Sequence, residues 1–137
     1  MHTPSESVVL VDSHCHLIQL DLTDFNTLDQ VLLEAKQQGV SHFLCVCITR
    51  EDVPHLERIA AQYSDVSISV GVHPSDTISS NITTDELIKL GSHKACIAIG
   101  ETGLDYYRVE EKDWGIQQES FRSHIRCLLY TSDAADE

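Results

Sequence analysis

Positive charge is scarce in this sequence. Lysine and arginine together number 9 against 22 acidic residues, which gives a formal net charge of −13 over 137 residues. A protein that holds nucleic acid by general electrostatic attraction presents a basic surface instead. The composition therefore excludes that mode of binding. A phosphate-bearing substrate would need bound metal to supply much of the positive charge.

Long apolar runs are also absent. The longest are strand-sized, well short of the roughly 18 residues that a membrane span needs. The first seven residues show neither a basic region nor a following apolar stretch, so no secretory signal is predicted. The five cysteines are odd in number and lack a scaffold-like spacing, which agrees with a reducing compartment. We therefore expect a cytoplasmic protein without membrane association and without an obligate protein partner.

Apolar strands and amphipathic helices alternate along the chain. Strands are expected at 8–12, 42–48, 66–72 and 95–100, and helices at 27–38, 53–63, 83–90 and from 115 through 125. The first strand reads as buried, and continuous apolar strands of this kind are typical of a parallel α/β sheet. Each unit takes roughly 30 residues, so a complete (β/α)₈ barrel of about 250 residues would need twice this length. The chain is thus either a small open α/β domain or about four βα units of a TIM-type barrel.

Residues of the types that bind metals follow several of these strands. His14 and His16 end the first strand, His73 follows the third, Glu101 follows the fourth, and Asp105 lies just beyond. Alternate side chains of an extended strand point the same way, so both imidazoles of the His-x-His pair can face one point. Because the ends of parallel strands meet at one edge of the sheet, these groups are expected to converge there. Imidazoles and a carboxylate suit one or two divalent ions that activate water.

Each of these residues alone has an ordinary structural explanation. His73 with Pro74 can form a turn, Glu101 can be a solvated carboxylate at a loop entry, and Asp105 can cap an Asx-turn. Ligand-type residues at three separate strand ends favour a shared metal site over three independent coincidences.

Other polar and sulfur-containing residues are assigned structural roles. Cys45 and Cys47 are expected to pack in the core, and Cys15, between the two histidines, is expected to point away from them. Trp114 is expected to anchor the loop before the last helix. The histidines without evident partners are expected on the surface: His42, His55, His93 and His124.

Four motifs resemble the TatD family of metal-dependent deoxyribonucleases. They are VDSHCHL at 11–17, GVHP at 71–74, IGETGLDY at 99–106 and QQESF at 117–121. The similarity runs from about residue 8 to 126 and keeps the family's order and spacing. It implies an amidohydrolase-superfamily barrel that hydrolyses DNA phosphodiester bonds with divalent metal ions.

The resemblance also implies roles for individual residues. His14 and His16 would bind one metal ion, and Glu101 would bridge two ions as the central catalytic residue. The complete site would hold two ions, with magnesium, manganese and zinc left open.

Around these ligands the resemblance implies a supporting set of residues. His73 would touch substrate phosphate, while Asp105 and Tyr106 would support the loop that carries Glu101. The family's site also needs two further histidines and an aspartate from later strands, which this sequence does not contain.

The last eleven residues depart from the family pattern. Residues 127–137 resemble the translation of a sequencing adapter, so we expect 1–126 to be the first half of the barrel and 127–137 a non-native tail. A genuine polar terminus is the alternative. The chain as written is then expected to be a weak metal binder and an inactive nuclease. Two other readings remain open: a hydrolase of the same superfamily or a His-x-His phosphoesterase with a small substrate, and a non-catalytic fragment.

Overall fold

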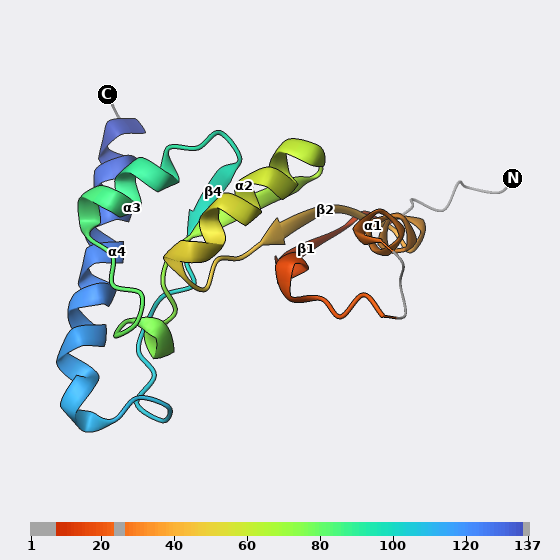
Figure 1. Cartoon of the computed structure of the whole chain (residues 1–137). Coiled ribbons are helices and arrows are strands. Elements are labelled where there is room, and N and C mark those ends of the chain that lie inside the picture. Colours follow the sequence, from red (N-terminus) through yellow and green to blue (C-terminus); the bar gives the residue numbers. More distant parts are fainter. Residues whose placement is uncertain (1–7, 24–26, 136–137) are drawn as a thin grey trace, which may run out of the picture.

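The computed structural model describes residues 8–23 and 27–135 (Figure 1). The segment on which the absence of a secretory signal was predicted lies outside these residues, as does the end of the expected tail at 136–137. Strands and helices alternate in the order β1 Leu10–Cys15, α1 Leu28–Gln37, β2 Val40–Cys45, α2 Val53–Gln62, β3 Val66–Val70, α3 Thr84–Gly91, β4 Cys96–Ile99 and α4 Trp114–Ala135. The predicted alternation is therefore confirmed.

The four strands form one parallel sheet in the order β1-β2-β3-β4. Each strand lies beside the one that precedes it in the sequence, with a helix in between. This is the order of a βα barrel wall, whereas a doubly wound sheet reverses its strand order at a switch point. The sheet thus has the topology of four consecutive barrel units.

The helices α1 and α3 begin at threonine caps. The Thr27 side chain accepts a hydrogen bond from the Gln30 N–H at 3.3 Å at the start of α1. Thr83 and Glu86 form a reciprocal capping box at the start of α3. Gly39, with φ of 96°, takes the left-handed conformation that ends α1 and lets the chain enter β2. These local signals mark where α1 and α3 begin and where α1 ends.

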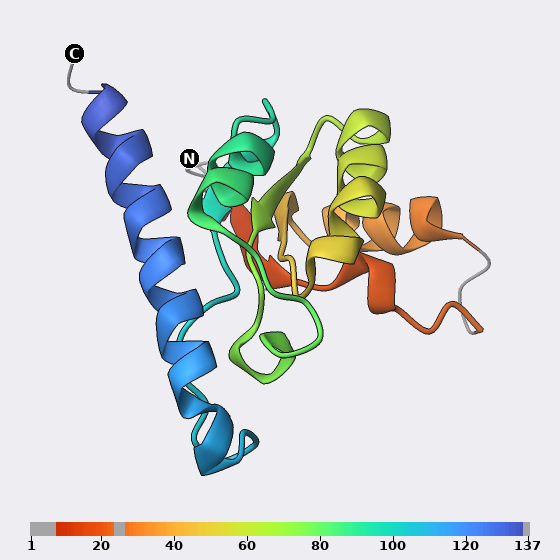
Figure 2. The same ribbon diagram turned by 60° about the vertical axis from the view of Figure 1, so that its left-hand side comes forward.

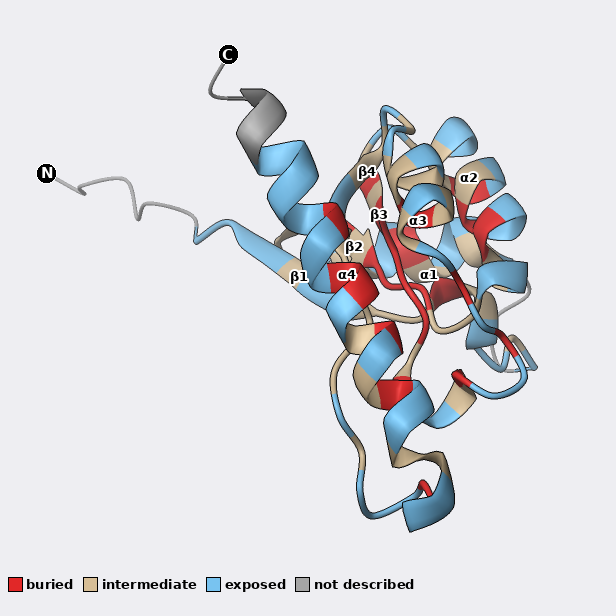
Figure 3. Ribbon diagram, turned by 90° about the vertical axis from the view of Figure 1, so that its left-hand side faces the viewer, coloured by how far each residue is buried: buried red, intermediate tan, exposed pale blue. Residues whose placement is uncertain are grey.

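The hydrophobic core lies between the sheet and the helices. Alternate residues of β2 and β3, among them Phe43 and Ile68, are buried against residues from all four helices. The helix residues of this core include Leu32, Leu56, Leu87 and Cys127. The helices therefore cover one face of the sheet, and Figure 3 shows their buried sides turned toward β3. Cys45 and Cys47 are fully buried, which confirms their predicted packing role.

The prediction that the first strand is buried is wrong. Val9 and Val11 are 68% and 58% exposed, and Figure 3 shows β1 largely exposed. Ile97 of β4 is 64% exposed at the opposite end of the sheet. Both strands are edges of the described sheet, so each has a neighbour on one side alone. Apolar strands lacking a second neighbour and a second covering layer are what half of a barrel leaves exposed.

The helix α4 continues through the boundary at which the tail was expected to begin. It runs from Trp114 to Ala135, and Cys127 is fully buried within the core. Figures 1 and 2 show α4 lying along α3. Beyond Cys127, Leu128 and Tyr130 are exposed. A non-native origin of residues 127–137 stays a prediction. Among the described residues, no helix combines the length and apolarity needed to cross a membrane.

The expectation that His124 lies on the surface is wrong. It is 1% exposed, its Nε2 accepts the Val72 N–H at 2.9 Å, and its Nδ1 lies 2.6 Å from the Ser120 carbonyl oxygen. The neutral imidazole thus joins α4 to the end of β3. His42 and His93 also have partners, because His42 lies 2.7 Å from the Ser67 hydroxyl and His93 Nδ1 accepts the Ala95 N–H.

The buried His124 makes stability depend on pH. Burial lowers the pKa of His124, because the imidazolium would lose its hydration, although the hydrogen bond to the Ser120 carbonyl opposes this effect. In the unfolded chain the imidazole titrates near its ordinary value of about 6.5. The unfolded state therefore takes up a proton first as the pH falls, and His124 contributes less stability below about pH 6.5 than above it.

We predict that His124→Gln flattens this pH dependence. Urea unfolding of the native chain should show stability falling between about pH 7.5 and about pH 5.5, with a smaller fall for the variant. His55→Gln is the matched control, since His55 is exposed on α2 and should leave the native slope unchanged. Equal slopes in the native chain and His124→Gln would contradict the assignment.

Candidate metal centre

Two imidazoles and one carboxylate converge at the carboxyl end of the sheet. His14 Nε2 lies 3.4 Å from Glu101 Oε1, and His16 Nε2 lies 3.7 Å from Glu101 Oε2. One ligand atom from each residue can be chosen so that all lie within 4.8 Å of one another. Within the described part of the chain, this is the one group of three or more such residues with that geometry. The predicted convergence of β1 and β4 at one edge is therefore observed.

A bulge at the end of β1 aims the two histidines. Asp12 pairs with Phe43, and Cys15 pairs with Cys45. Between these two pairs β1 contains one more residue than β2, which is a β-bulge. The Asp12 carboxylate accepts the His14 N–H at 3.1 Å and holds the bulged backbone. Cys15 turns to the helix side, where its thiol donates to the Leu44 carbonyl at 3.4 Å. The two imidazoles consequently share the opposite side of the strand, as the i, i+2 spacing predicts.

The backbone that carries Glu101 is fixed by hydrogen bonds across three strand ends. The Glu101 N–H donates to the Cys47 carbonyl at 2.8 Å. The buried Ser69 hydroxyl donates to the Gly100 carbonyl at 2.6 Å and accepts the Cys47 N–H at 2.9 Å. One serine of β3 therefore ties the residue before Glu101 to the segment that follows β2. This arrangement presents the Glu101 side chain, 25% exposed, to both imidazoles.

Gly71 lets the end of β3 approach this segment closely. A Cβ atom at residue 71 would lie 2.6 Å from the Gly100 carbonyl carbon and 2.7 Å from the Glu101 oxygen. Such distances are shorter than any van der Waals contact, and the atoms are backbone atoms that cannot rotate away. A side chain at this position would displace the residue that carries the carboxylate.

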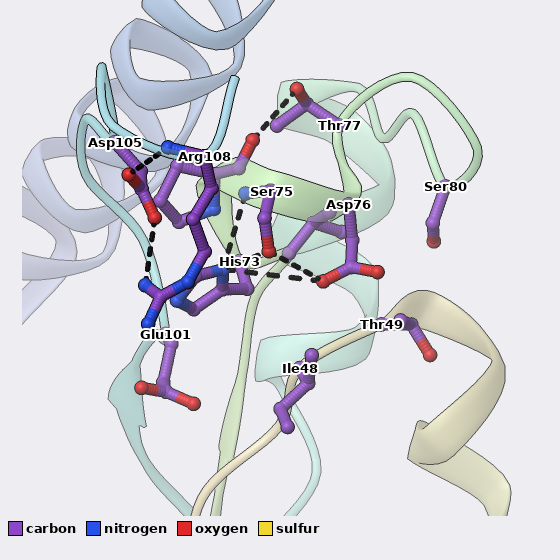
Figure 4. Close-up of polar contacts among 12 residues, drawn as sticks. Ile48, Thr49, His73, Ser75, Asp76, Thr77, Ser80, Glu101, Asp105 and Arg108 are labelled. Atoms are coloured by element: carbon purple, nitrogen blue, oxygen red, sulfur yellow. Dashed lines mark hydrogen bonds and ion pairs between the residues drawn. The ribbon is translucent and has the colours of Figure 1, made fainter.

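His73 lies outside the ligand cluster. Its Nδ1 accepts the Ser75 N–H at 3.1 Å and faces the Ser75 hydroxyl at 2.7 Å, with Asp76 Oδ2 at 4.0 Å (Figure 4). The ring is thus held by the short turn that follows β3, with Nδ1 used as an acceptor. In the neutral tautomer that accepts this bond, the proton lies on Nε2.

Asp105 organises the loop after β4. Its carboxylate accepts the backbone N–H groups of Arg108 at 2.9 Å and Tyr107 at 3.1 Å, and it pairs with the Arg108 guanidinium at 3.0 Å. These bonds, the Arg108 N–H first among them, lower the pKa of Asp105. In Figure 4 the Arg108 side chain extends toward His73 and Glu101. Asp105 therefore has the Asx-turn role and at the same time holds an arginine at the edge of the site.

Tyr106 attaches the same loop to α4. Its hydroxyl accepts a hydrogen bond from the Gln118 side chain at 2.8 Å, and its ring packs on Trp114 with centroids 4.4 Å apart. The Trp114 indole N–H donates to the Val109 carbonyl at 2.9 Å, in agreement with its predicted anchoring role. Gln117 adds a bond from the Asp105 N–H at 2.6 Å. The last sequence motif thus supports the loop rather than the ligand cluster.

The donor set fits a divalent cation of the first transition row or zinc. Neutral imidazole suits these ions, and a carboxylate with two oxygens can serve one ion or bridge two. Three protein ligands leave room for water, which is the arrangement of a catalytic rather than a structural site. The side chains of His14 and His16 are 54% and 32% exposed, so the described chain leaves the imidazoles open to solvent.

Sequence reasoning missed two residues that position Glu101, Ser69 and Gly71, and the arginine that pairs with Asp105. Ser69 looked like an ordinary strand residue, since nothing in its neighbourhood marks a buried hydroxyl that joins two other strands. Gly71 ends an apolar strand directly before a ligand-type histidine, and that position was a usable signal. Arg108 could have been found from its i, i+3 spacing to Asp105.

Comparison with known proteins settles the family. The family model described as TatD related DNase matches residues 11–128, most of the chain. The chain belongs to this family. The TatD resemblance seen in the four motifs is thereby confirmed, and membership implies a divalent metal.

Two curated relatives of this chain come from Escherichia coli K12. The uncharacterized metal-dependent hydrolase YcfH is 37% identical over 134 residues, covering 91% of this chain and 50% of YcfH. The 3′-5′ ssDNA/RNA exonuclease TatD is 29% identical over 106 residues, covering 77% of this chain and 39% of TatD.

A solved TatD-family structure confirms the fold class. The hydrolase from Entamoeba histolytica superimposes with a TM-score of 0.70 at 26% identity, covering 88% of this chain and 46% of that chain. The chain thus spans about half the length of the relatives it matches. The four βα units are half of a TatD-type TIM barrel, not a small open domain.

We predict that Gly71→Ala weakens metal binding by about 10–100-fold, the range found when residues that support metal ligands are replaced. The added methyl group would push the Gly100–Glu101 backbone away from the histidines. Manganese titration followed by electron paramagnetic resonance measures the change, and circular dichroism checks the fold. Gly115→Ala is the matched control, because nothing lies within 4 Å of a Cβ atom there. Unchanged manganese affinity in Gly71→Ala would refute the positioning role.

Proposed function

We propose that the complete protein is a metal-dependent phosphodiesterase that acts on DNA. The observation that carries the proposal is the convergence of His14, His16 and Glu101 at the carboxyl edge of the sheet. Family membership supports hydrolysis with a metal, and one TatD-family relative bears a name that specifies single-stranded DNA and RNA as substrates. The second half of the barrel is proposed to add the remaining ligands.

In this proposal each described residue has a defined task. His14, His16 and Glu101 would hold the divalent metal, the histidines as neutral imidazoles and Glu101 as the carboxylate. Bound metal would polarise the phosphate and lower the pKa of a water molecule. His73 Nε2–H and the Arg108 guanidinium would donate to phosphate oxygens beside the ligands. Asp105 keeps that guanidinium in place through its carboxylate.

The scarcity of basic residues supports a substrate site that depends on bound metal and on local cations. With a net charge of −13, the surface as a whole repels a polyanion. Binding of a nucleic acid would therefore depend on the metal ions and on Arg108 at the site itself. Affinity for the substrate should then be lost when the metal is chelated.

A hydrolase acting on a small substrate is the second candidate. The relative at 37% identity is named a metal-dependent hydrolase with no substrate, which is compatible with either candidate. Cleavage of small phosphate esters or amides by the complete protein, with no cleavage of DNA, would select this candidate.

We predict that Glu101→Gln abolishes metal-dependent cleavage of single-stranded DNA by the complete protein, obtained by extending the gene past the codon for Arg126. The amide keeps the size of the side chain but loses the charge needed to bind metal. Glu119→Gln on the exposed face of α4 is the matched control and should retain activity. Full activity of Glu101→Gln would remove this residue from the catalytic site.

We further predict that the 137-residue chain alone does not hydrolyse DNA. Its described residues offer three ligands and leave the imidazoles open to solvent, and the later barrel strands are missing from its sequence. A fluorescent oligonucleotide incubated with the purified chain and magnesium or manganese should remain intact. Metal-dependent cleavage that co-purifies with the chain would overturn this expectation.

A further inference from the structure

The sheet has two strand edges without a neighbouring strand in the part of the chain that the structure describes. The order β1-β2-β3-β4 leaves β1 free on the side away from β2 and β4 free on the side away from β3. Exposed apolar side chains lie along both edges, namely Val9 and Val11 at β1 and Ile97 on β4. Unpaired backbone N–H and C=O groups beside apolar side chains form a template on which a further strand can pair.

The helix α4 extends the apolar surface beyond β4. Its buried residues, such as Cys127, pack into the core. Phe121, Ile125 and Leu128 follow one another at four- and three-residue spacing and form a neighbouring stripe, in which Ile125 and Leu128 are exposed. A groove of about 180 Å³ lies beside this stripe and is lined by residues 96–99 of β4 together with Leu128. The free edge of β4 therefore lies next to an apolar helix flank, where a further strand would be buried.

The direction of the strands decides which edge can pair with which. All four strands are parallel, so β1 and β4 are free on opposite sides of the sheet. Two β4 edges could meet only as antiparallel strands. A parallel strand added to β4 must instead present the side on which β1 is free. A second copy of this chain presents that side in the required direction.

We propose that two copies of this 137-residue chain close one eight-stranded barrel. β4 of each copy would pair with β1 of the other, so a twofold axis along the barrel relates the copies and no strand edge stays free. Four strands from each copy make the eight strands of a TIM-type barrel. Two chains also match the length of one relative, because this chain covers 50% of YcfH. The apolar flank of α4 would cover β1 of the other copy.

Closure would bring both ligand clusters to one mouth of the barrel. His14 and His16 lie at the end of β1, and Glu101 follows β4, so the ligands are carried by the two strands that form the seams. The imidazoles of each copy would then lie next to the strand of the other copy that leads to Glu101. The second copy repeats the first four βα units and adds none of the later ones, so the dimer is not expected to hydrolyse DNA.

The net charge of the chain opposes this association. Each copy carries a formal charge of −13, whereas the seam residues Val11, Ile97, Ile125 and Leu128 are apolar. Repulsion between exposed charges is screened beyond a Debye length of about 8 Å at physiological ionic strength. The dimer should therefore become tighter as sodium chloride is added, the opposite of an association that depends on ion pairs.

Sedimentation velocity of the purified chain at several concentrations tests the proposal. The expected species is a dimer with twice the monomer mass of 15.3 kDa, in equilibrium with monomer. A monomer at every concentration, a ladder of larger assemblies, or aggregate without a defined mass would each overturn the proposal.

Substitutions on the two sides of the seam test which edges meet. Ile125→Asp on α4 and Val11→Asp on β1 should each give monomers, because each would bury a carboxylate in the same seam. Ile78→Asp is the matched control and should remain dimeric, since Ile78 is also exposed but lies in the loop between β3 and α3. Circular dichroism checks the fold of each variant. Val9→Asp, just before β1, replaces Val11→Asp if that variant is unfolded.

Hydrogen exchange followed by mass spectrometry identifies the strands in the seam. Amides of both β1 and β4 should exchange more slowly in the native dimer than in monomeric Ile125→Asp, although the substitution lies on α4. A contact between two α4 helices would leave the exchange of β1 unchanged. Equal exchange of β1 in the two proteins, a dimer that persists when β1 carries the aspartate, or loss of the dimer in Ile78→Asp would each contradict the closed barrel.

Discussion

The close approach of three strand ends is the constraint on which the metal centre depends. Gly71 at the end of β3 lies so near the Gly100–Glu101 backbone that a single methyl group does not fit between them. The Ser69 hydroxyl donates a hydrogen bond to the Gly100 carbonyl, and the Glu101 N–H donates to the Cys47 carbonyl. A carboxylate placed in this way can face two imidazoles from a strand that lies on the far side of β2 and β3. This backbone contact therefore determines where the Glu101 carboxylate lies.

Much of the fold follows from local patterns in the sequence. Apolar strands alternate with amphipathic helices, and the capping residues Thr27 and Thr83 begin their helices as predicted. The convergence of ligands could also be predicted, because parallel strands bring their ends to one edge. His14, His16 and Glu101 meet because each lies at the carboxyl end of its strand, although Glu101 is far from the histidines in the sequence.

The failed predictions concern what surrounds a residue in three dimensions. The apolar character of β1 predicts burial, but a strand is buried only if neighbours cover it, and the described chain supplies β2 on one side alone. His124 is buried because α4 packs it against the segment after β3, where the Val72 N–H donates to its Nε2. The role of Ser69 can be recognised only in the folded sheet, where its hydroxyl bonds the segments that follow β2 and β4. Such features depend on tertiary contacts that no single segment encodes.

The acidic surface and the half barrel together define what the chain can do. The chain carries a net charge of −13, and Asp105 holds the Arg108 guanidinium through an ion pair at 3.0 Å. The relatives are about twice as long as the matched region, so their barrels contain strands beyond β4. The centre described in this chain is the part that the first four βα units contribute.

X-ray absorption spectroscopy of the zinc-loaded chain tests the central claim most directly, because it reports the ligand atoms themselves. The account predicts nitrogen scattering at about 2.0–2.1 Å with the multiple-scattering pattern of imidazole, and no sulfur shell at about 2.3 Å. Replacing both His14 and His16 with glutamine should remove the imidazole pattern. A spectrum dominated by sulfur, or an imidazole pattern that persists in the double variant, would contradict the assignment of the metal centre.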